Sequence, residues 1–448
     1  MMVSSLNNIE ENMKQIATGI NGLDKVLEGG FLRPSIVLIA GIAGTGKTTL
    51  AMQSIFNAAR NEEICMYVVA LSEPIAMINN FMSRFSFYNI SLLGKGYIKY
   101  VPVDIDVIHK GPKAIIEEME KSVETIRPDR IVIDPINVFT MGQDEESRRR
   151  FYYDFFISMK SWNSHVLLTG EFNEEELERS ILSYLVDGTI YLDFENSCCQ
   201  NRYLNVLKMR GQNFQGGKHS FKITKDGISV FARLSAGKRK SYTKEHISTG
   251  IKGLDQMTAG GFLKGSAILI SGSSGLGKTM IGMRFIIEGL LKNEAGIIIS
   301  FEEDALQIRE NSRIFCKDIE GFEKKGLLKI FSSLDFEANE FALQLDEIIE
   351  RSDTRRLLFD GTARLAQMLP QFVQYSEYIT NIINTLRNKN ITAIYTNESS
   401  NLTGATQITG IGLSQAMDTI ILLRYVEIKS EMRKAISVLK MRGSNHEK

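Results

Sequence analysis

The sequence lacks the long apolar runs that carry a chain through a membrane. No run approaches the roughly 18 apolar residues that indicate a transmembrane helix. The N-terminal segment MMVSSLNNIEENMKQ has no basic stretch followed by an apolar one, so it does not resemble a signal peptide. We therefore expect a soluble protein of the cytoplasm.

Cysteine is scarce as well, with four residues in 448. These cysteines show neither a CxxC pair nor metal-ligand spacing with histidine, and the adjacent Cys198 and Cys199 are poorly placed for an ordinary disulfide. The pattern favours reduced thiols and argues against a cysteine-based metal site.

An excess of one charge is also missing, because 53 lysines and arginines balance 53 aspartates and glutamates. The chain therefore has no overall positive field that would attract nucleic acid or an anionic membrane. Its length and its hydrophobic fraction of 43% suffice for two globular domains with separate cores.

What the chain does contain is an internal duplication. The segment TGINGLD at 18–24 recurs as TGIKGLD at 249–255 (249 − 18 = 231), and Gly-Gly-Phe recurs at the same spacing. This period exceeds the roughly 20 to 50 residues of solenoid repeats, so each copy is predicted to be a complete domain. We place the domains at residues 1–236 and 237–448. The boundary near Gly237 has the composition of a polar linker, which we favour over a nucleic-acid patch for its basic residues 238–240.

Both copies have the pattern of an α/β domain. Short apolar runs bounded by turn residues alternate with helix-like segments, which indicates a largely parallel sheet flanked by helices. Closely spaced β-rich runs near the end of each copy predict antiparallel strands at the sheet edge. The predicted strands are 35–40, 67–71, 130–133 and 165–169 in the first copy, and 267–270, 296–301, 356–359, 392–396, 419–425 and 435–439 in the second.

Each copy carries a phosphate-binding loop, or P-loop. GIAGTGKT at 41–48 and GSSGLGKT at 272–279 match G-x-x-x-x-G-K-[ST] between a strand-like and a helix-like run. Backbone N–H groups of such a loop wrap the phosphates, the lysine reaches the β and γ phosphates, and the threonine ligates Mg²⁺. The sequence thus predicts two sites for ATP and Mg²⁺. Their nucleotide-binding residues are predicted to be Gly44, Thr45, Gly46, Lys47, Thr48 and Thr49, and Gly275, Leu276, Gly277, Lys278, Thr279 and Met280.

An acidic residue that orients the metal is expected at the end of a neighbouring strand. RIVID ends at Asp134 and RLLFD ends at Asp360, each after the P-loop and before a further strand. Aspartates in such places also serve as turn or helix caps, but the recurrence favours metal binding. The predicted Mg²⁺ ligands are Thr48 and Asp134 in the first copy, and Thr279, Glu302 and Asp360 in the second.

The copies differ at the end of the second strand. The second copy has Glu302 and Glu303 there, and a carboxylate in this place can accept a proton from the group that attacks the γ-phosphate. A helix-cap role is the alternative for this pair. The first copy reads Leu71-Ser72-Glu73, so its first carboxylate is missing. We predict a catalytic site in the second copy and a weakened ATPase in the first.

A third recurring motif is Lys-Met-Arg. Two cations one residue apart on a strand point to the same face, which suits a pair inserted at a phosphate, although a solvated basic pair is the alternative. Its residues complete the predicted nucleotide sites: Lys208, Met209 and Arg210, and Lys440, Met441 and Arg442. The predicted catalytic residues are Lys278, Glu302, Glu303, Lys440 and Arg442.

These motifs, together with Phe-Glu-Glu at 301–303 and DTIILLRYVE at 418–427, resemble the KaiC family of double-domain RecA-like ATPases over almost the whole chain. The resemblance implies two stacked hexameric rings with ATP between neighbouring subunits. It also implies that the second ring is an autokinase and autophosphatase. The Lys-Met-Arg cations would then reach the nucleotide of the adjacent subunit.

The phosphoacceptors of that family are an adjacent serine and threonine just before the Asp-Thr-Ile-Ile run. The corresponding residues here are Ser414 and Gln415, so the threonine is absent. Thr409 matches another family hydroxyl that transiently holds phosphate. We therefore predict Ser414 and Thr409 as acceptors and expect no two-site cycle of the usual form.

The resemblance leaves a KaiB-like partner open. Clock-type members continue into a tail that binds KaiA, whereas this sequence ends at Lys448, so we expect no KaiA-dependent clock. Two other functions stay open from the residues alone. One is a DNA-acting RecA-like ATPase, which the balanced charge does not support, and the other is a scaffold whose assembly ATP controls.

Overall fold

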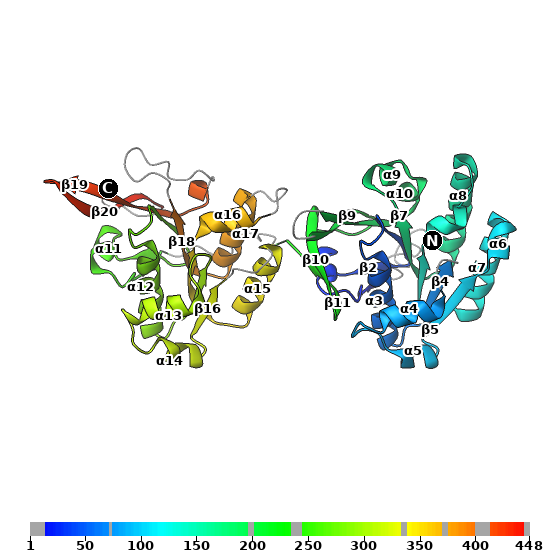
Figure 1. The fold of residues 1–448 in the computed structure, drawn as a ribbon, viewed down its shortest axis with the longest axis horizontal. Helices are drawn as coiled ribbons and strands as arrows, with labels where there is room; N and C mark the ends of the chain where they lie inside the picture. Colours follow the sequence, from blue (N-terminus) through cyan, green and yellow to red (C-terminus); the bar gives the residue numbers. More distant parts are fainter. Residues whose placement is uncertain are drawn as a thin grey trace, which may run out of the picture. The chain divides into compact units, whose positions relative to one another are not determined.

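A computed structural model of the chain describes residues 14–70, 74–195, 201–233, 244–332, 338–369, 375–398 and 413–442. The chain divides into two compact units, Met1–Arg233 and Leu234–Lys448. Each unit has its own sheet (Figure 1). Apolar residues pack in two clusters in each unit. The predicted boundary at Gly237 and the basic residues 238–240 lie outside the described residues.

Within the described residues, the first unit is built on a nine-stranded sheet with the order β11-β10-β9-β8-β3-β7-β6-β4-β5. The strands from β8 to β5 in this order are parallel, whereas β9, β10 and β11 continue the sheet in antiparallel fashion. The strands are β3 (Ser35–Gly41), β4 (Cys65–Ala70), β5 (Ile98–Val103), β6 (Arg130–Asp134), β7 (His165–Glu171), β8 (Gly188–Glu195), β9 (Asn201–Met209), β10 (Lys218–Thr224) and β11 (Gly227–Phe231), beside the small pair β1 (Lys14–Ile16) and β2 (Phe31–Arg33). The helices are α2 (Leu23–Val26), α3 (Lys47–Arg60), α4 (Ile75–Met82), α5 (Ile90–Gly94), α6 (Ile105–His109), α7 (Pro112–Ile126), η1 (Ile136–Thr140), α8 (Glu145–Ser161), α9 (Glu174–Arg179) and α10 (Ile181–Leu185).

Alternate residues of the central strands divide between two apolar cores. Val37 and Ile39 of β3 pack in the core that includes α3, while Ile36 and Leu38 pack in the core that includes α7 and α8. A parallel strand that is buried on both faces has a continuous apolar sequence, so the run 35–40 could be recognised.

In the described part of the second unit, a seven-stranded sheet has the order β16-β15-β17-β18-β14-β19-β20. This order repeats that of β5-β4-β6-β7-β3-β8-β9, and β19–β20 is its one antiparallel pair. The strands are β14 (Ala267–Gly272), β15 (Ala295–Ser300), β16 (Leu328–Ser332), β17 (Thr354–Asp360), β18 (Thr392–Glu398), β19 (Thr419–Ile428) and β20 (Glu431–Met441), beside the pair β12 (His246–Ile247) and β13 (Phe262–Leu263). The helices are α11 (Lys252–Met257), α12 (Lys278–Leu291), α13 (Ala305–Arg313), α14 (Ile319–Lys324), α15 (Ala338–Glu350), α16 (Thr362–Met368), α17 (Tyr375–Asn388) and η2 (Leu413–Gln415).

The predicted fold class is confirmed in both units, including the antiparallel strands added at one sheet edge. The outer strands β5 and β16 were not predicted, because both mix buried and partly exposed residues and so lack a continuous apolar run. Among the described helices, none combines the length and apolarity needed to span a membrane.

The repeated TGIxGLD and Gly-Gly-Phe segments at the start of each unit stabilise the fold. Asp24 accepts a hydrogen bond from the backbone N–H of Thr18 at 2.8 Å, and Asp255 forms the same bond at 2.8 Å. Gly30 and Gly261 have φ values of 108° and 111°, and a Cβ at either would lie 2.2 or 2.1 Å from a backbone oxygen. Glycine is therefore required there for backbone shape.

Candidate functional sites

Both P-loops turn directly from a buried strand into a long helix. β3 leads into α3, which begins at Lys47, and β14 leads into α12, which begins at Lys278. The preceding Gly46 and Gly277 have φ values of 106° and 95°, which residues with a Cβ rarely adopt. The free N–H groups at each helix start, together with the helix dipole, make this turn favourable for a phosphate.

The two P-loop lysines make equivalent contacts. Lys47 Nζ donates to the carbonyl oxygen of Ile42 at 2.8 Å, and Lys278 Nζ donates to that of Ser273 at 2.9 Å. Burial lowers the pKa of Lys47, although the carboxylates of Glu171 and Asp134 oppose this shift. Both ammonium groups therefore lie over their own loop, where a phosphate would bind.

Asp360, at the end of β17, lies beside the P-loop of the second unit. The hydroxyl of Thr279 contacts both of its carboxylate oxygens, at 3.0 and 3.2 Å, and that of Thr396 donates to it at 2.6 Å. Burial raises the pKa of Asp360, and the hydrogen bonds from these threonines partly offset the rise. A hydroxyl and a carboxylate are the oxygen donors that Mg²⁺ prefers, so Thr279 and Asp360 fit the predicted metal.

Glu302 and Glu303 follow β15 in a turn that Ser300 stabilises. The Ser300 hydroxyl accepts hydrogen bonds from the backbone N–H groups of Glu302 at 3.2 Å and Glu303 at 2.9 Å. The side chain of Glu303 accepts a hydrogen bond from Asn311 at 3.0 Å, which ties it to α13. The structure therefore separates the surroundings of the two glutamates.

Glu302 shares the electrostatic surroundings of the P-loop. Burial and the nearby charge of Asp360 raise the pKa of Glu302, whereas the ammonium of Lys278 lowers it. Gly361 leaves room for this side chain, because a Cβ there would lie 2.8 Å from Glu302 Cγ. The structure thus brings Lys278, Asp360 and Glu302 together, and a carboxylate of raised pKa suits proton transfer.

In the first unit, Asp134 at the end of β6 corresponds to Asp360, but other side chains surround it. Asp134 accepts hydrogen bonds from the hydroxyl of Tyr67 at 2.6 Å and from that of Thr169. The predicted difference between the copies, at Leu71 to Glu73, lies outside the described residues. A cavity of about 430 Å³ beside Asp134 is lined by residues that include Gly44, Gly46, Lys47, Thr48, Thr49, Tyr67, Asp134 and Glu171.

The Lys-Met-Arg cations of the second unit contact the segment that precedes β19. Lys440 Nζ donates to the carbonyl oxygens of Ser414 at 2.9 Å and Met417 at 2.8 Å, and Arg442 donates to that of Gln415 at 3.2 Å. The predicted acceptor Ser414 and the predicted cations are therefore together. Thr409 lies outside the described residues.

The first unit repeats this arrangement before β8. Lys208 Nζ donates to the carbonyl oxygen of Ser183 at 2.9 Å, and Arg210 donates to that of Tyr184 at 2.7 Å. Both groups lie at the amino ends of the parallel strands, whereas the P-loops follow their carboxyl ends. Neither pair of cations is therefore near the P-loop of its own unit.

The apolar members of the predicted nucleotide sites lie in or against the cores. Leu276 and Met441 are buried, and Met209 and Met280 are partly buried. Their side chains therefore contribute to the packing of the two units.

A further cation on each antiparallel hairpin was not predicted. Arg202 of β9 donates to the carbonyl oxygen of Gly44 at 2.7 Å, and Lys434 of β20 donates to that of Gly275 at 2.8 Å. The two cations are separated by 232 positions (434 − 202), within one residue of the P-loop spacing. An internal alignment carried through the hairpins would have found them.

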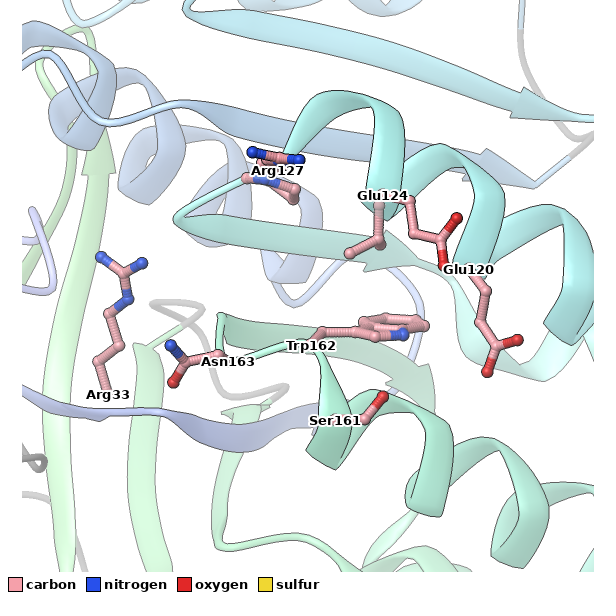
Figure 2. Close-up of a pocket in the computed structure, with 9 residues that line it drawn as sticks. Arg33, Glu120, Glu124, Arg127, Ser161, Trp162 and Asn163 are labelled. Carbon is pink, nitrogen blue, oxygen red and sulfur yellow. The ribbon is translucent and has the colours of Figure 1, made fainter. Parts of the chain in front are cut away.

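A second cavity of the first unit lies at the amino-terminal edge of its sheet. It has a volume of about 540 Å³, and Figure 2 shows Glu120, Glu124 and Arg127 of the α7 region around it, with Trp162 and Arg33. None of the described residues predicted for nucleotide, metal or phosphate lines this cavity.

Comparison with known proteins gives one consistent family. The family model described as "ATPase: KaiC" matches residues 16–235 and again residues 247–448. The circadian clock oscillator protein KaiC of a Picosynechococcus species is 30% identical over 99% of this chain and 89% of the relative. The proteins of that name from Rippkaea orientalis and Synechococcus elongatus are 30% and 29% identical, over 98% and 100% of this chain and 87% and 89% of the relatives.

The matched ranges cover both units, and each matched range contains a P-loop that joins a buried strand to a helix. The strand order is also repeated between the units. The chain therefore belongs to the KaiC family of ATP-binding ATPases.

Proposed function

We propose that this chain is a serine autokinase that assembles into a hexameric ring, with each kinase site shared between two subunits. The proposal extends the ATPase chemistry of the family to phosphoryl transfer onto Ser414. The observation that carries it is that Ser414 precedes β19, beside the start of β14, whereas the P-loop follows the end of β14.

The distance between these ends is too long for transfer within one chain. Ser414 precedes β19, whose first residue, Thr419, pairs with Ile268 near the start of β14, whereas the P-loop begins at Gly272, where β14 ends. At about 3.3 Å per residue, the length of β14 separates them by roughly 16 Å. Reacting atoms must approach to about 3–3.5 Å, so a neighbouring subunit has to supply the ATP. A ring of head-to-tail contacts brings the two edges together.

The donor edge contains the groups that phosphoryl transfer requires. When bound, Mg²⁺ would neutralise charge on the β and γ phosphates, and Thr279 and Asp360 would hold it. Lys278 stabilises the charge of the transferring group. Glu302 accepts the proton of the attacking serine hydroxyl. The serine oxygen bonds to the γ-phosphorus while the bond to the bridging oxygen breaks, so the products are phosphoserine and ADP.

The acceptor edge combines the hydroxyl with two cations. Lys440 and Arg442 hold the backbone of the segment that contains Ser414. Their positive charges would meet the phosphates of the neighbouring subunit and stabilise the transferring phosphoryl group. This arrangement explains why the cations lie away from their own P-loop.

Intact-protein and peptide mass spectrometry after incubation with ATP and Mg²⁺ tests the proposal. We expect the wild-type chain to gain one phosphoryl group on the peptide that contains Ser414, and native spectra to show six chains. Ser414→Ala and Glu302→Gln should not gain it. Ser183→Ala is the matched control, because Ser183 precedes β8 as Ser414 precedes β19, and this variant should behave as the wild type. An unmodified Ser414 peptide in ATP-loaded wild-type protein would rule out the kinase.

A further inference from the structure

The strand end beside the first P-loop carries a carboxylate that no sequence motif singles out. Glu171 is the last residue of β7, and its register partner is Gly41, the first residue of the P-loop. β7 lies between β3, which leads to the P-loop, and β6, which ends at Asp134. Glu171 therefore stands between the loop that receives phosphates and the carboxylate predicted to hold the metal.

Asn137 fixes the backbone at this point. Its side-chain oxygen accepts a hydrogen bond from the N–H of Glu171 at 2.8 Å, and its side-chain amide donates to the Glu171 carbonyl oxygen at 3.2 Å. Asn137 belongs to η1, which follows β6. The two hydrogen bonds tie the end of β7 to the segment after Asp134.

The side chain of Glu171 lines the same cavity as Lys47 and Asp134. Burial lowers the pKa of Lys47, and the charge of Glu171, followed by that of Asp134, opposes this shift. The hydroxyls of Tyr67 and Thr169 donate hydrogen bonds to the carboxylate of Asp134. Within the described residues, no hydrogen bond is formed to the carboxylate of the exposed Glu171, so it can accept one from water.

The second unit shows what a glutamate in this register can reach. Glu398, the last residue of β18, pairs with Gly272 as Glu171 pairs with Gly41. Its charge contributes to raising the pKa of Glu302. The charge of a glutamate at this strand end therefore acts on the carboxylate that we propose as the proton acceptor in the second unit.

We propose that Glu171 activates the attacking water in the first unit, an inference that rests on the ATP site predicted there and on the family's ATPase activity. The water oxygen bonds to the γ-phosphorus, the bond between that phosphorus and the bridging oxygen breaks, and ADP leaves with the electron pair. One water proton passes to the Glu171 carboxylate and then to solvent. Glu171 takes the place of the first carboxylate that the segment Leu71 to Glu73 lacks, so the first unit hydrolyses ATP.

Steady-state hydrolysis by the full-length chain with Lys278→Ala isolates the first unit, and adding Lys47→Ala gives the background. In the Lys278→Ala chain, Glu171→Gln should lower kcat about 10²-fold, as expected for loss of a general base. Its affinity for a fluorescent ATP analogue should change less than about twofold, because uniform binding is retained. Glu174→Gln, an exposed glutamate of α9, is the matched control and should keep the parent rate.

Three results would overturn the inference. In the first, kcat of the Glu171→Gln chain stays within about twofold of its parent. In the second, Glu73→Gln abolishes hydrolysis while Glu171→Gln does not. In the third, the Lys278→Ala chain binds ATP but hydrolyses it no faster than the double variant. Phosphate on Ser414 of the wild-type chain is unaffected by any of these results, so the inference and the kinase proposal fail independently.

Discussion

At the scale of single residues, the second unit contains two carboxylates, Asp360 and Glu302, that are close to the P-loop. Burial makes it harder for both to ionise. Asp360 is 1% exposed, and burial is the largest cause of its raised pKa and of the raised pKa of Glu302. Two negative groups in such surroundings destabilise the folded protein when no cation is bound. We therefore expect these carboxylates to lower the stability of the nucleotide-free protein, as is common for residues kept for activity rather than for stability.

Asp360→Asn should stabilise the nucleotide-free chain in a way that depends on pH. Because the folded pKa of Asp360 is raised, the folded state keeps a proton that the unfolded state has lost, so wild-type stability falls as pH rises through this range. Asparagine does not titrate. Near pH 8 we expect the variant to melt roughly 2–4 °C above the wild type, a shift that corresponds to about 1 kcal/mol, with a smaller difference near pH 5. Phosphorylation of Ser414 should be lost.

Thermal unfolding by circular dichroism at the two pH values measures this effect. Asp353→Asn is the control, since Asp353 is 83% exposed in the same unit, and it should melt as the wild type at both. An equal difference between Asp360→Asn and wild type at both pH values would show that ionisation of Asp360 does not cost stability.

At the scale of elements, a buried arginine anchors the strand that ends in Asp360, the predicted metal ligand. Arg356 of β17 is 1% exposed, pairs with Glu294 at 2.6 Å, and donates to the carbonyl oxygens of Ser248 at 2.8 Å and Phe285 at 3.0 Å. Arg130 of β6 is equally buried and is bound by α3 and the N-terminal segment. Each strand is thereby fixed to the helix that carries its P-loop lysine.

Arg356→Met should destabilise the second unit by about 3 kcal/mol, because Glu294 and two backbone carbonyl groups lose their donor. The measurement is chemical denaturation of the full-length chain. The adjacent Arg355→Met removes an ion pair in which Arg355 is 43% exposed, and it should change stability by no more than about 0.5 kcal/mol. Equal effects of the two substitutions would show that Arg356 is not an anchor.

The pattern of apolar and polar residues within each strand explains which parts of the fold could be predicted from the sequence. The central strands are buried on both faces and carry continuous apolar runs, whereas β5 and β16 mix buried and exposed residues. Arg130 and Arg356 were visible only as polar boundaries of apolar runs. Their burial depends on partners that are distant in sequence, which no local pattern reports.

At the scale of the whole molecule, duplication produces two P-loop regions that share a strand order and differ in the side chains around the strand-end aspartate. The order of the P-loops and of the strand-end aspartates along the chain predicted that the two motifs of each unit lie together, because parallel strands end at one edge. The structure has Thr279 beside Asp360, and Lys47 and Asp134 around one cavity. The position of Ser414 at the opposite edge could not be predicted, since it depends on the register of β19 against β14. That register is the basis of the proposed transfer between two subunits.

A mixing experiment tests this shared site most directly. The Glu302→Gln chain keeps Ser414, which accepts the phosphate, but lacks the carboxylate that accepts the proton. The Ser414→Ala chain keeps that carboxylate but lacks the serine. The two chains are dissociated, combined and reassembled with ATP, and phosphate on the Ser414 peptide is measured by mass spectrometry. We predict no phosphate on Ser414 in either chain alone and clear phosphorylation of the Glu302→Gln chain in the mixture. Phosphorylation of wild-type protein together with an unmodified mixture would contradict transfer between subunits.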